Sequence, residues 1–98
     1  MEDWVSSKGS EVVVKGISRI EWSEGGPARF HLIAAQIRGS IRQGTFAPGE
    51  RLPSEKEMTQ VYGWSRGTVR TACGLLEKEG LIRKQQGVGM FVADPLPD

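Results

Sequence analysis

The sequence predicts an α+β fold that is mostly helical, with three helices followed by a small antiparallel β-hairpin. Two observations predict this class. Apolar residues recur at three- and four-residue steps in three segments between residues 28 and 80, which is the period of an amphipathic helix. After residue 80 the apolar period becomes two, and a glycine-rich turn divides two short runs of β-forming residues.

Length and composition limit the chain to one domain with a tail. Its 98 residues carry a formal net charge of +1, and no apolar run approaches the roughly 20 residues that cross a bilayer. The first residues, Met1 to Trp4, lack the basic start and apolar centre of a signal peptide. The single cysteine, Cys73, has no internal partner for a disulfide. We therefore expect a reducing, cytoplasmic setting and no membrane association.

A break at Gly25-Gly26-Pro27 divides the chain. We expect residues 1–26 to form an N-terminal arm that is mobile or loosely attached; a strand or short helix added to the domain is the alternative. We expect residues 27–93 to be the folded domain and the proline-containing residues 94–98 to be the start of a linker. The arm has three basic and five acidic residues, whereas the rest of the chain has ten basic and seven acidic ones. The positive excess in the domain is compatible with a nucleic-acid partner.

Residues 28–43 are predicted to form the first helix. Phe30, Ile33, Ile37 and Ile41 recur at three- and four-residue steps, so they share one face of a helix. Arginine and glutamine side chains lie away from this face. The pattern indicates a helix with one buried side and one solvent side.

Residues 45–53 are predicted to be a connector. Pro48-Gly49 marks a tight turn, because proline fixes φ and glycine accepts positive φ. Phe46 and Leu52 are the expected core anchors of this connector. Arg51-Leu52 is a candidate for one short strand.

The second helix is predicted to begin after Ser54. Ser54 and Glu57 have the spacing of a capping box, in which each side chain bonds the backbone N–H of the other residue. Gly63 ends this helix, and Ser65 is a good N-cap for the next one. Two helices joined by a short glycine-containing turn are typical of a helix-turn-helix.

The third helix is predicted to run from Ser65 to just before Gly80, which suits the left-handed residue past a helix end. Residues on one side of it form an apolar stripe that we expect to be buried. These residues are Val69, Ala72, Cys73 and Leu76.

The other side of this helix is basic and polar near the N-terminus, where it carries Arg66, Gly67, Arg70 and Thr71. A helix with a buried face and an exposed basic tip has the form that proteins insert into the major groove of DNA.

Residues 81–86 and 90–93 are predicted to be the strands of a hairpin, with a tight turn at Gly87-Val88-Gly89. Three helices that contain a helix-turn-helix, followed by a β-hairpin, make a winged helix-turn-helix domain. We expect its third helix to lie in the major groove and its hairpin, the wing, at the adjacent minor groove.

Four segments carry a more specific pattern: Pro48-Gly49-Glu50-Arg51-Leu52-Pro53-Ser54-Glu55, Tyr62-Gly63-Trp64-Ser65-Arg66-Gly67-Thr68-Val69-Arg70, Leu76-Glu77-Lys78-Glu79-Gly80-Leu81-Ile82 and Gln86-Gly87-Val88-Gly89-Met90-Phe91-Val92. In this order and spacing, over residues 28–93, the chain resembles the GntR family of bacterial transcription regulators. The first 26 residues are not covered by the resemblance.

The resemblance implies a repressor that binds a short palindromic DNA operator as a homodimer, either in the full-length protein or on DNA. It also implies that a small-molecule effector binds a C-terminal domain beyond these 98 residues, so no cofactor is expected in this chain. Because the family's dimer contacts lie largely in that domain, we expect the isolated chain to be mainly monomeric. By position, the family's DNA-contacting roles fall on Lys56, Arg66, Thr68, Arg70, Gln86 and Gly87.

The residue types in the third helix fit contacts to DNA. Arg66 and Arg70 lie one helical turn apart, and each can donate two parallel hydrogen bonds to guanine O6 and N7. Ser65 and Gly67, in the same first turn, complete the predicted DNA-binding set of this helix. Ser54 and Ser65, as caps of two helices, are also expected to lie near phosphates, because helix N-termini attract anions.

The wing and the second helix contribute the remaining candidates. Gln86 can donate or accept a hydrogen bond at a minor groove, and Gly87 allows the backbone to approach it closely. Lys56 stands where arginine is common in the family, so paired hydrogen bonds to guanine are less expected there. Trp64 stands in the turn where a smaller aliphatic residue is usual.

Other functions have less support in the sequence. The serine, histidine and aspartate residues form no catalytic motif, and Gly87-Val88-Gly89 is too short for a phosphate-binding loop. His31 has no neighbouring cysteines or acids in a metal-ligand pattern, so we expect neither an enzyme nor a metalloprotein. The alternative is a winged helix that binds another protein through its third helix. The basic and polar exposed side of that helix favours DNA.

Overall fold

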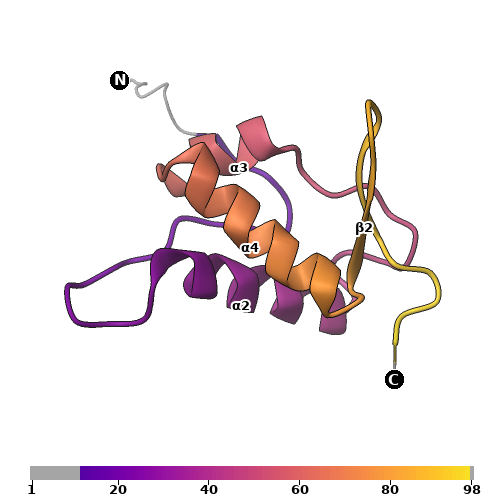
Figure 1. Ribbon diagram of the computed structural model, residues 1–98, viewed down its shortest axis with the longest axis horizontal. Coiled ribbons are helices and arrows are strands. Elements are labelled where there is room, and N and C mark those ends of the chain that lie inside the picture. The colour runs from indigo at the N-terminus through magenta and orange to yellow at the C-terminus, as the bar shows by residue number, and fades with distance from the viewer. Residues whose placement is uncertain (1–11, 98) are drawn as a thin grey trace.

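The computed structural model describes residues 12–97, and within them three helices precede a two-stranded antiparallel sheet (Figure 1). The predicted winged helix-turn-helix fold is confirmed. Each observed helix lies within one or two residues of its predicted bounds. The elements are α2 (Arg29–Arg42), α3 (Glu55–Tyr62), α4 (Arg66–Lys78), β2 (Ile82–Gln85) and β3 (Gly89–Val92).

The core lies where the three helices meet. α4 packs against both α2 and α3, and its end leads into β2. Phe46 and Leu52, the predicted anchors of the connector, are 2% and 3% exposed. The side chains that are exposed by 2% or less include Ile33, Ala34, Ile37, Ile41, Phe46, Met58, Tyr62, Val69, Ala72, Cys73, Leu76, Ile82 and Val92.

Local hydrogen bonds fix the helix-turn-helix, and both predicted N-caps are confirmed. The Ser54 hydroxyl accepts from the Glu57 N–H at 3.1 Å, and the Glu57 carboxylate accepts from the Ser54 N–H at 2.9 Å. Ser65 Oγ accepts from the Thr68 N–H at 3.1 Å. Between the two helices Gly63 has a φ of 72°, a left-handed conformation that costs glycine little because it has no Cβ. The direction of α4 is therefore set by its own turn and cap.

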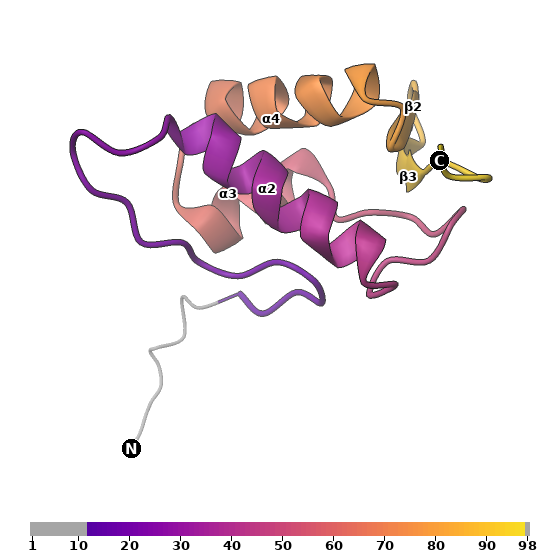
Figure 2. The ribbon, with the colours of Figure 1, turned by 90° about the horizontal axis from the view of Figure 1, so that it is seen from below.

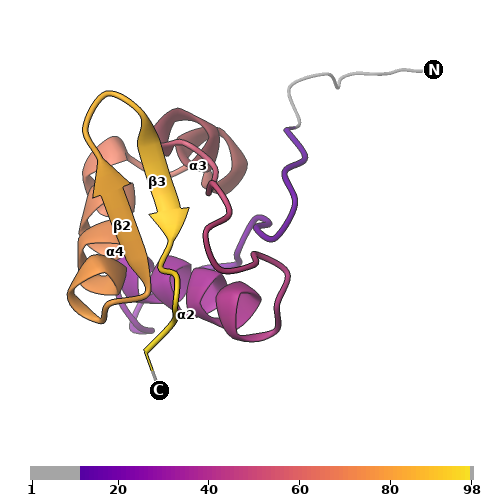
Figure 3. The ribbon, with the colours of Figure 1, turned by 90° about the vertical axis from the view of Figure 1, so that its right-hand side faces the viewer.

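The predicted hairpin is confirmed, and it forms the wing. Ile82 pairs with Val92 and Gln85 pairs with Gly89, so residues 86–88 make the tip. Figure 3 shows the hairpin face-on, with the tip on the same side of the molecule as α3. The wing and the start of the helix-turn-helix are thus presented in one direction.

The short strand predicted at Arg51-Leu52 is reduced to an isolated bridge between Arg51 and Phe91. The Leu52 N–H donates to the Met90 carbonyl at 2.8 Å. Pro53 has no N–H, so the ladder cannot continue toward α3. The segment still fastens the connector to β3 beside the wing.

Residues 12–26 have a defined place against α2, on the side opposite α4 (Figure 2). Ile17 is buried with 6% exposed, and the Gly16 carbonyl accepts from Ser40 Oγ at 2.6 Å. The Ser18 N–H donates to Gln36 Oε1 at 2.8 Å, and Gln36 Nε2 donates to Ser18 Oγ at 3.2 Å. These contacts hold the segment at particular points along α2.

Gly16 also lies directly against the ring of Phe46. A Cβ placed on Gly16 would be 2.4 Å from Phe46 Cζ, and Gly16 has a φ of 85°. Residues 12–26 contain an isolated bridge between Val14 and Ile17 but no helix or extended strand. The predicted arm boundary at residue 26 and the predicted mobility of the arm stay predictions, and residues 1–11 lie outside the described part of the chain.

Candidate nucleic-acid interface

α4 has an inner face and an outer face with opposite character. The inner face, formed by Val69, Ala72, Cys73 and Leu76, has no solvent exposure at any of these side chains. The outer face, formed by Arg66, Gly67, Arg70 and Thr71, is exposed throughout. Because 3.6 residues make one turn, Arg66 and Arg70 project from the same side of the helix. The predicted division of this helix into a buried stripe and a basic side is confirmed.

Ser65 caps the first turn of α4 by a hydrogen bond with Thr68. Ser65 Oγ accepts from the Thr68 N–H, and the two hydroxyls lie 2.9 Å apart. The Thr68 hydroxyl is therefore engaged inside the protein, and Thr68 is only partly exposed. Arg66 and Gly67 follow the cap directly, and N–H groups in a first turn lack intrahelical partners. This end of the helix offers donors and a partial positive charge to an anion.

Arg70 forms an ion pair with Glu55 that joins α4 to the first turn of α3. Arg70 Nε lies 3.2 Å from Glu55 Oε1, and the side chains are 61% and 28% exposed. An ion pair this exposed is weak and exchanges readily with solvent or another anion. Its effect is to orient the Arg70 side chain across the two helices. The sequence interpretation did not include Glu55; its place directly after the Ser54 cap was the available signal.

The remaining helix candidates lie at the start of α3. Ser54 and Lys56 are exposed, so Lys56 can reach a phosphate or a base. The Ser54 hydroxyl is occupied by its capping bond from the Glu57 N–H. Ser54 therefore contributes by fixing the helix end, in a first turn that also carries Glu55 and Glu57.

The wing tip is exposed, and a hydrogen bond from Arg51 connects it to the segment before α3. Gln86, Gly87 and Val88 are all exposed, and Gly87 has a φ of 78°. Arg51 Nη2 donates to the Val88 carbonyl at 2.8 Å. An ordered tip with glycine at its end can approach a groove closely. Arg51 was predicted only as part of a strand, and no local pattern indicates its bond across 37 residues.

The remaining residues considered for catalysis or metal binding are Cys73 and His31. Among residues 12–97 no group of three or more His, Cys, Asp or Glu side chains could hold a metal ion. Burial raises the pKa of the Cys73 thiol to about 11, which keeps it protonated and unreactive at neutral pH. His31 lies against the ring of Phe30, with ring centroids 4.3 Å apart. No helix in this part of the chain is long and apolar enough to cross a membrane.

Comparison with known proteins agrees with this geometry. The family model described as bacterial regulatory proteins, gntR family, matches residues 31–92. The HTH-type transcriptional regulator Rv0792c of Mycobacterium tuberculosis is 44% identical over 64 residues, which are 65% of this chain and 24% of that protein. The histidine utilization repressor of Klebsiella aerogenes is 43% identical over 70 residues, which are 70% of this chain and 29% of the repressor. The chain thus spans about a quarter of the length of these relatives.

A solved structure gives the same picture. The chain is similar to AraR(DBD) in complex with operator ORX1, with a TM-score of 0.69 and 35% sequence identity over 79% of this chain and 93% of that one. The family consists of regulators, which supports the expectation that this chain is not an enzyme. The fold, the basic outer face of α4 and the family match over residues 31–92 agree. This chain therefore belongs to the GntR family of DNA-binding bacterial transcription regulators.

Proposed function

We propose that this chain binds an operator in double-stranded DNA, with α4 in the major groove and the wing tip at the neighbouring minor groove. The observation that carries the proposal is the contrast between the two faces of α4. Its inner face is fully buried, while Arg66 and Arg70 stand on the exposed outer face. The core therefore holds α4 in place through its inner face. Arg66 and Arg70 remain exposed to solvent and are available to bind DNA.

The proposed contacts divide into two kinds. Arg66 and Arg70 discriminate bases, since a guanidinium can bond guanine O6 and N7 together. Lys56, Ser65 and Thr68 contact or orient phosphates, with Ser54 acting through the end of α3. These phosphate contacts set the register of the protein on DNA and most of its salt dependence.

The wing adds a second point of contact. Gln86 and Gly87 lie at its exposed tip, and a Cβ added to Gly67, at the start of α4, would lie 3.9 Å from Ser65 Oγ, an ordinary contact distance. We propose that both glycines allow the backbone to come close to DNA where a side chain would hold it away. The Arg51 bond to the Val88 carbonyl supports this by ordering the tip before DNA arrives.

The regulatory mode is proposed from the relatives. Several of them are repressors by name, among them the histidine utilization repressor of Klebsiella aerogenes and the arabinose metabolism transcriptional repressor of Geobacillus stearothermophilus. We propose that the protein acts as a repressor on a palindromic operator, as a homodimer in its full-length form or on DNA. A small-molecule effector would act through a further domain, and the described residues would need no cofactor.

The proposal is tested by selection from a random-sequence duplex pool with the 98-residue chain at two salt concentrations, followed by sequencing of the bound DNA. We expect a short palindrome to be enriched and binding to fall steeply as salt rises. Binding without enrichment would contradict sequence-specific recognition by this domain. No binding even at low salt would overturn the proposal in favour of a protein-interaction module.

A further inference from the structure

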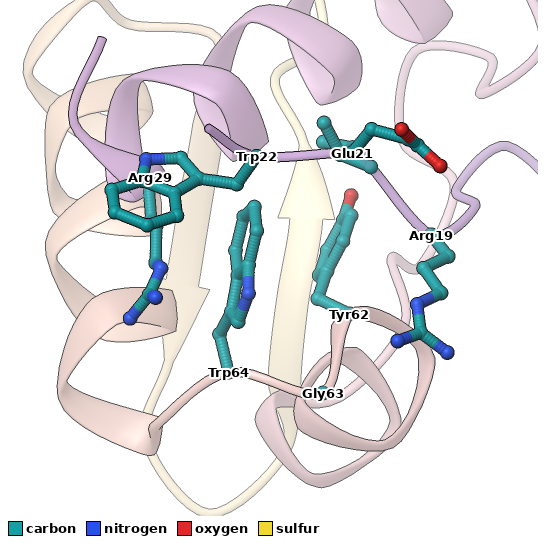
Figure 4. Close-up of a pocket in the computed structure, with 8 residues that line it drawn as sticks. Arg19, Glu21, Trp22, Arg29, Tyr62, Gly63 and Trp64 are labelled. Carbon is teal, nitrogen blue, oxygen red and sulfur yellow. The ribbon is translucent and has the colours of Figure 1, made fainter. Parts of the chain in front are cut away.

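A pocket of about 560 Å³ lies between the arm and the turn of the helix-turn-helix (Figure 4). Three parts of the chain form its walls: Arg19 to Trp22 from the arm, Arg29 from the start of α2, and Tyr62 to Trp64 from the turn. Trp64 is the residue that departs from the aliphatic side chain usual at this position. The pocket thus combines Trp64 with arm residues that lie outside the resemblance and with Tyr62 and Gly63, which belong to it.

Arg29 is held in this pocket by two tryptophans. Its Cζ atom lies 4.2 Å from the ring centroid of Trp22 and 5.6 Å from that of Trp64. Both distances are within the range of a cation–π interaction. Figure 4 shows the guanidinium beside both rings. A guanidinium held against aromatic rings still directs N–H donors from its edge, so Arg29 remains able to bind an anion.

The pocket is fixed to the helix-turn-helix by hydrogen bonds as well. Trp22 Nε1 donates to the Pro27 carbonyl at 3.1 Å. The Tyr62 hydroxyl donates to Gln36 Oε1 at 2.9 Å, and Gln36 also bonds Ser18 of the arm. Arm, α2 and the end of α3 are thus linked through one glutamine. The position of the arm is therefore coupled to the residues that set the start of α4.

The charge at this site is suited to an anion. Within residues 12–97, neither Arg19 nor Arg29 forms an ion pair with a carboxylate. Glu21 also lines the pocket, and Figure 4 shows its carboxylate directed away from the Arg29 and Trp64 side. Figure 4 shows Arg19 and Arg29 on opposite sides of the Trp64 and Tyr62 rings, with the Glu21 carboxylate on the Arg19 side. Each guanidinium can therefore take up its own phosphate through charge-assisted hydrogen bonds.

We infer that Arg19 and Arg29 bind phosphates of the DNA backbone at the edge of the major groove that α4 enters. Trp64 directly precedes the Ser65 cap, so the pocket borders the end of α4 that is proposed to enter the DNA. A major groove is about 12 Å wide, which brings its flanking phosphates within a side-chain length of an inserted helix. The inference rests on the proposed function and extends its contact surface to the arm.

The test uses single substitutions in the full 98-residue chain: Arg19→Ala and Arg29→Ala at the pocket, and Arg42→Ala as the matched control. Arg42 is exposed in the last turn of α2, about 20 Å along the helix from Arg29, and its loss changes the net charge equally. Affinity for the selected operator and for a scrambled duplex is measured by fluorescence anisotropy between about 50 and 200 mM salt.

We expect Arg19→Ala and Arg29→Ala each to reduce the slope of log affinity against log salt by about 1. Both should weaken binding by roughly two- to tenfold on either duplex, because phosphate contacts carry no sequence information. Arg42→Ala should match the wild-type chain. Arg29→Lys should keep the salt slope but bind more weakly than wild type, because lysine retains the charge and loses the planar donor edge.

Two results would overturn the inference. One is an unchanged salt slope for both Arg19→Ala and Arg29→Ala while Arg66→Ala still weakens operator binding; the pocket would then serve only to pack the arm, and the proposed function would stand. The other is an effect confined to the operator and absent from the scrambled duplex. If Arg66→Ala and Arg70→Ala also had no effect, the proposed function itself would fail. Circular dichroism of each variant checks the fold.

Discussion

The inner and outer faces of α4 lie on one helix but differ in their surroundings: the inner face packs against the core, and the outer face is open to solvent. The inner face has no exposure at any of its side chains and contacts α2 and α3. The outer face contributes to the fold mainly through the Arg70–Glu55 ion pair, whose arginine is 61% exposed. Under the proposed function, stability depends on one face of this helix and DNA recognition on the other, so substitutions on one face should change one property and leave the other.

Leu76→Ala on the inner face should have the largest effect on stability. It removes a fully buried side chain and leaves a cavity, so we expect the free energy of unfolding to fall by about 2–5 kcal/mol. Urea unfolding followed by circular dichroism measures this change. Leu75→Ala, one residue away and only partly buried, is the matched control and should cost less. An equal loss from both variants would contradict the division into faces.

Alkaline pH should destabilise the domain through Cys73 on the same face. Burial raises the pKa of its thiol from 9.0 to about 11 in the folded state. The unfolded chain loses this proton first, so the stability present below about pH 9 should decline by about 2 kcal/mol as pH rises to 11.

The check on Cys73 is unfolding of the wild-type chain and of Cys73→Ala at several pH values from neutral to pH 11. The pKa of Tyr62 is also raised, chiefly by burial, so some alkaline loss should remain in the variant at the highest pH. A pH dependence identical in both proteins would show that the buried thiol does not carry it.

Arg66→Ala and Arg70→Ala on the outer face should act on DNA binding. Each is expected to cost about 1–3 kcal/mol of operator binding and to change the free energy of unfolding by less than about 0.5 kcal/mol. Anisotropy with the selected operator and urea unfolding measure the two quantities separately. Operator binding by the double variant that matched wild type would mean that α4 is not the recognition helix.

Gly67→Ala should change both properties, in opposite directions. A Cβ at Gly67 would lie 3.9 Å from Ser65 Oγ, and one at Gly74 would have nothing within 4 Å. Both substitutions should stabilise α4 by up to about 1 kcal/mol, because alanine favours a helix over glycine. Only Gly67→Ala should weaken operator binding, since only it adds a methyl group to the end that approaches DNA. Equal affinity for the two variants would remove Gly67 from the interface.

The last prediction concerns the oligomeric state of the chain. The isolated 98-residue chain should be mainly monomeric, because the resemblance places most of the dimer contacts in another domain. Sedimentation at micromolar concentration measures this, and a stable dimer would contradict it. The operator selection would then be expected to enrich palindromes more strongly.

The helices, caps and hairpin could be predicted from the sequence because each depends on residues a few positions apart. Ser54 and Glu57 act within one turn, and the inner face of α4 follows from a 3.6-residue period. The division of α4 into two faces was predictable for the same reason. The strand at Arg51-Leu52 was wrong in extent because its length depends on the partner strand and on Pro53, which cannot donate.

The long-range polar contacts could not be predicted in this way. Arg38 lies on the side of the first helix that was expected to face solvent, yet its Nη2 lies 2.6 Å from Glu79 Oε2 across 41 residues. Arg29 meets Trp64 only after α2 and the turn have been placed by the core. The apolar periodicity of a segment does not predict such pairs, because each pair forms between two segments that the fold must first bring together. The hydrogen bonds that join residues 12–26 to α2 also belong to this class, since the partners of Ser18 and Gly16 lie 18 and 24 residues away in the sequence.

The close contact between Gly16 and Phe46 offers a way to detach the arm by adding a single carbon atom. Gly16→Ala would place a methyl group 2.4 Å from the Phe46 ring at a φ of 85°, a conformation that alanine rarely adopts. It would remove no charge, hydrogen-bond donor or aromatic ring. For protein engineering, this position offers a way to perturb the attachment of the N-terminal segment without truncation, and it leaves every residue of the helix-turn-helix as it is.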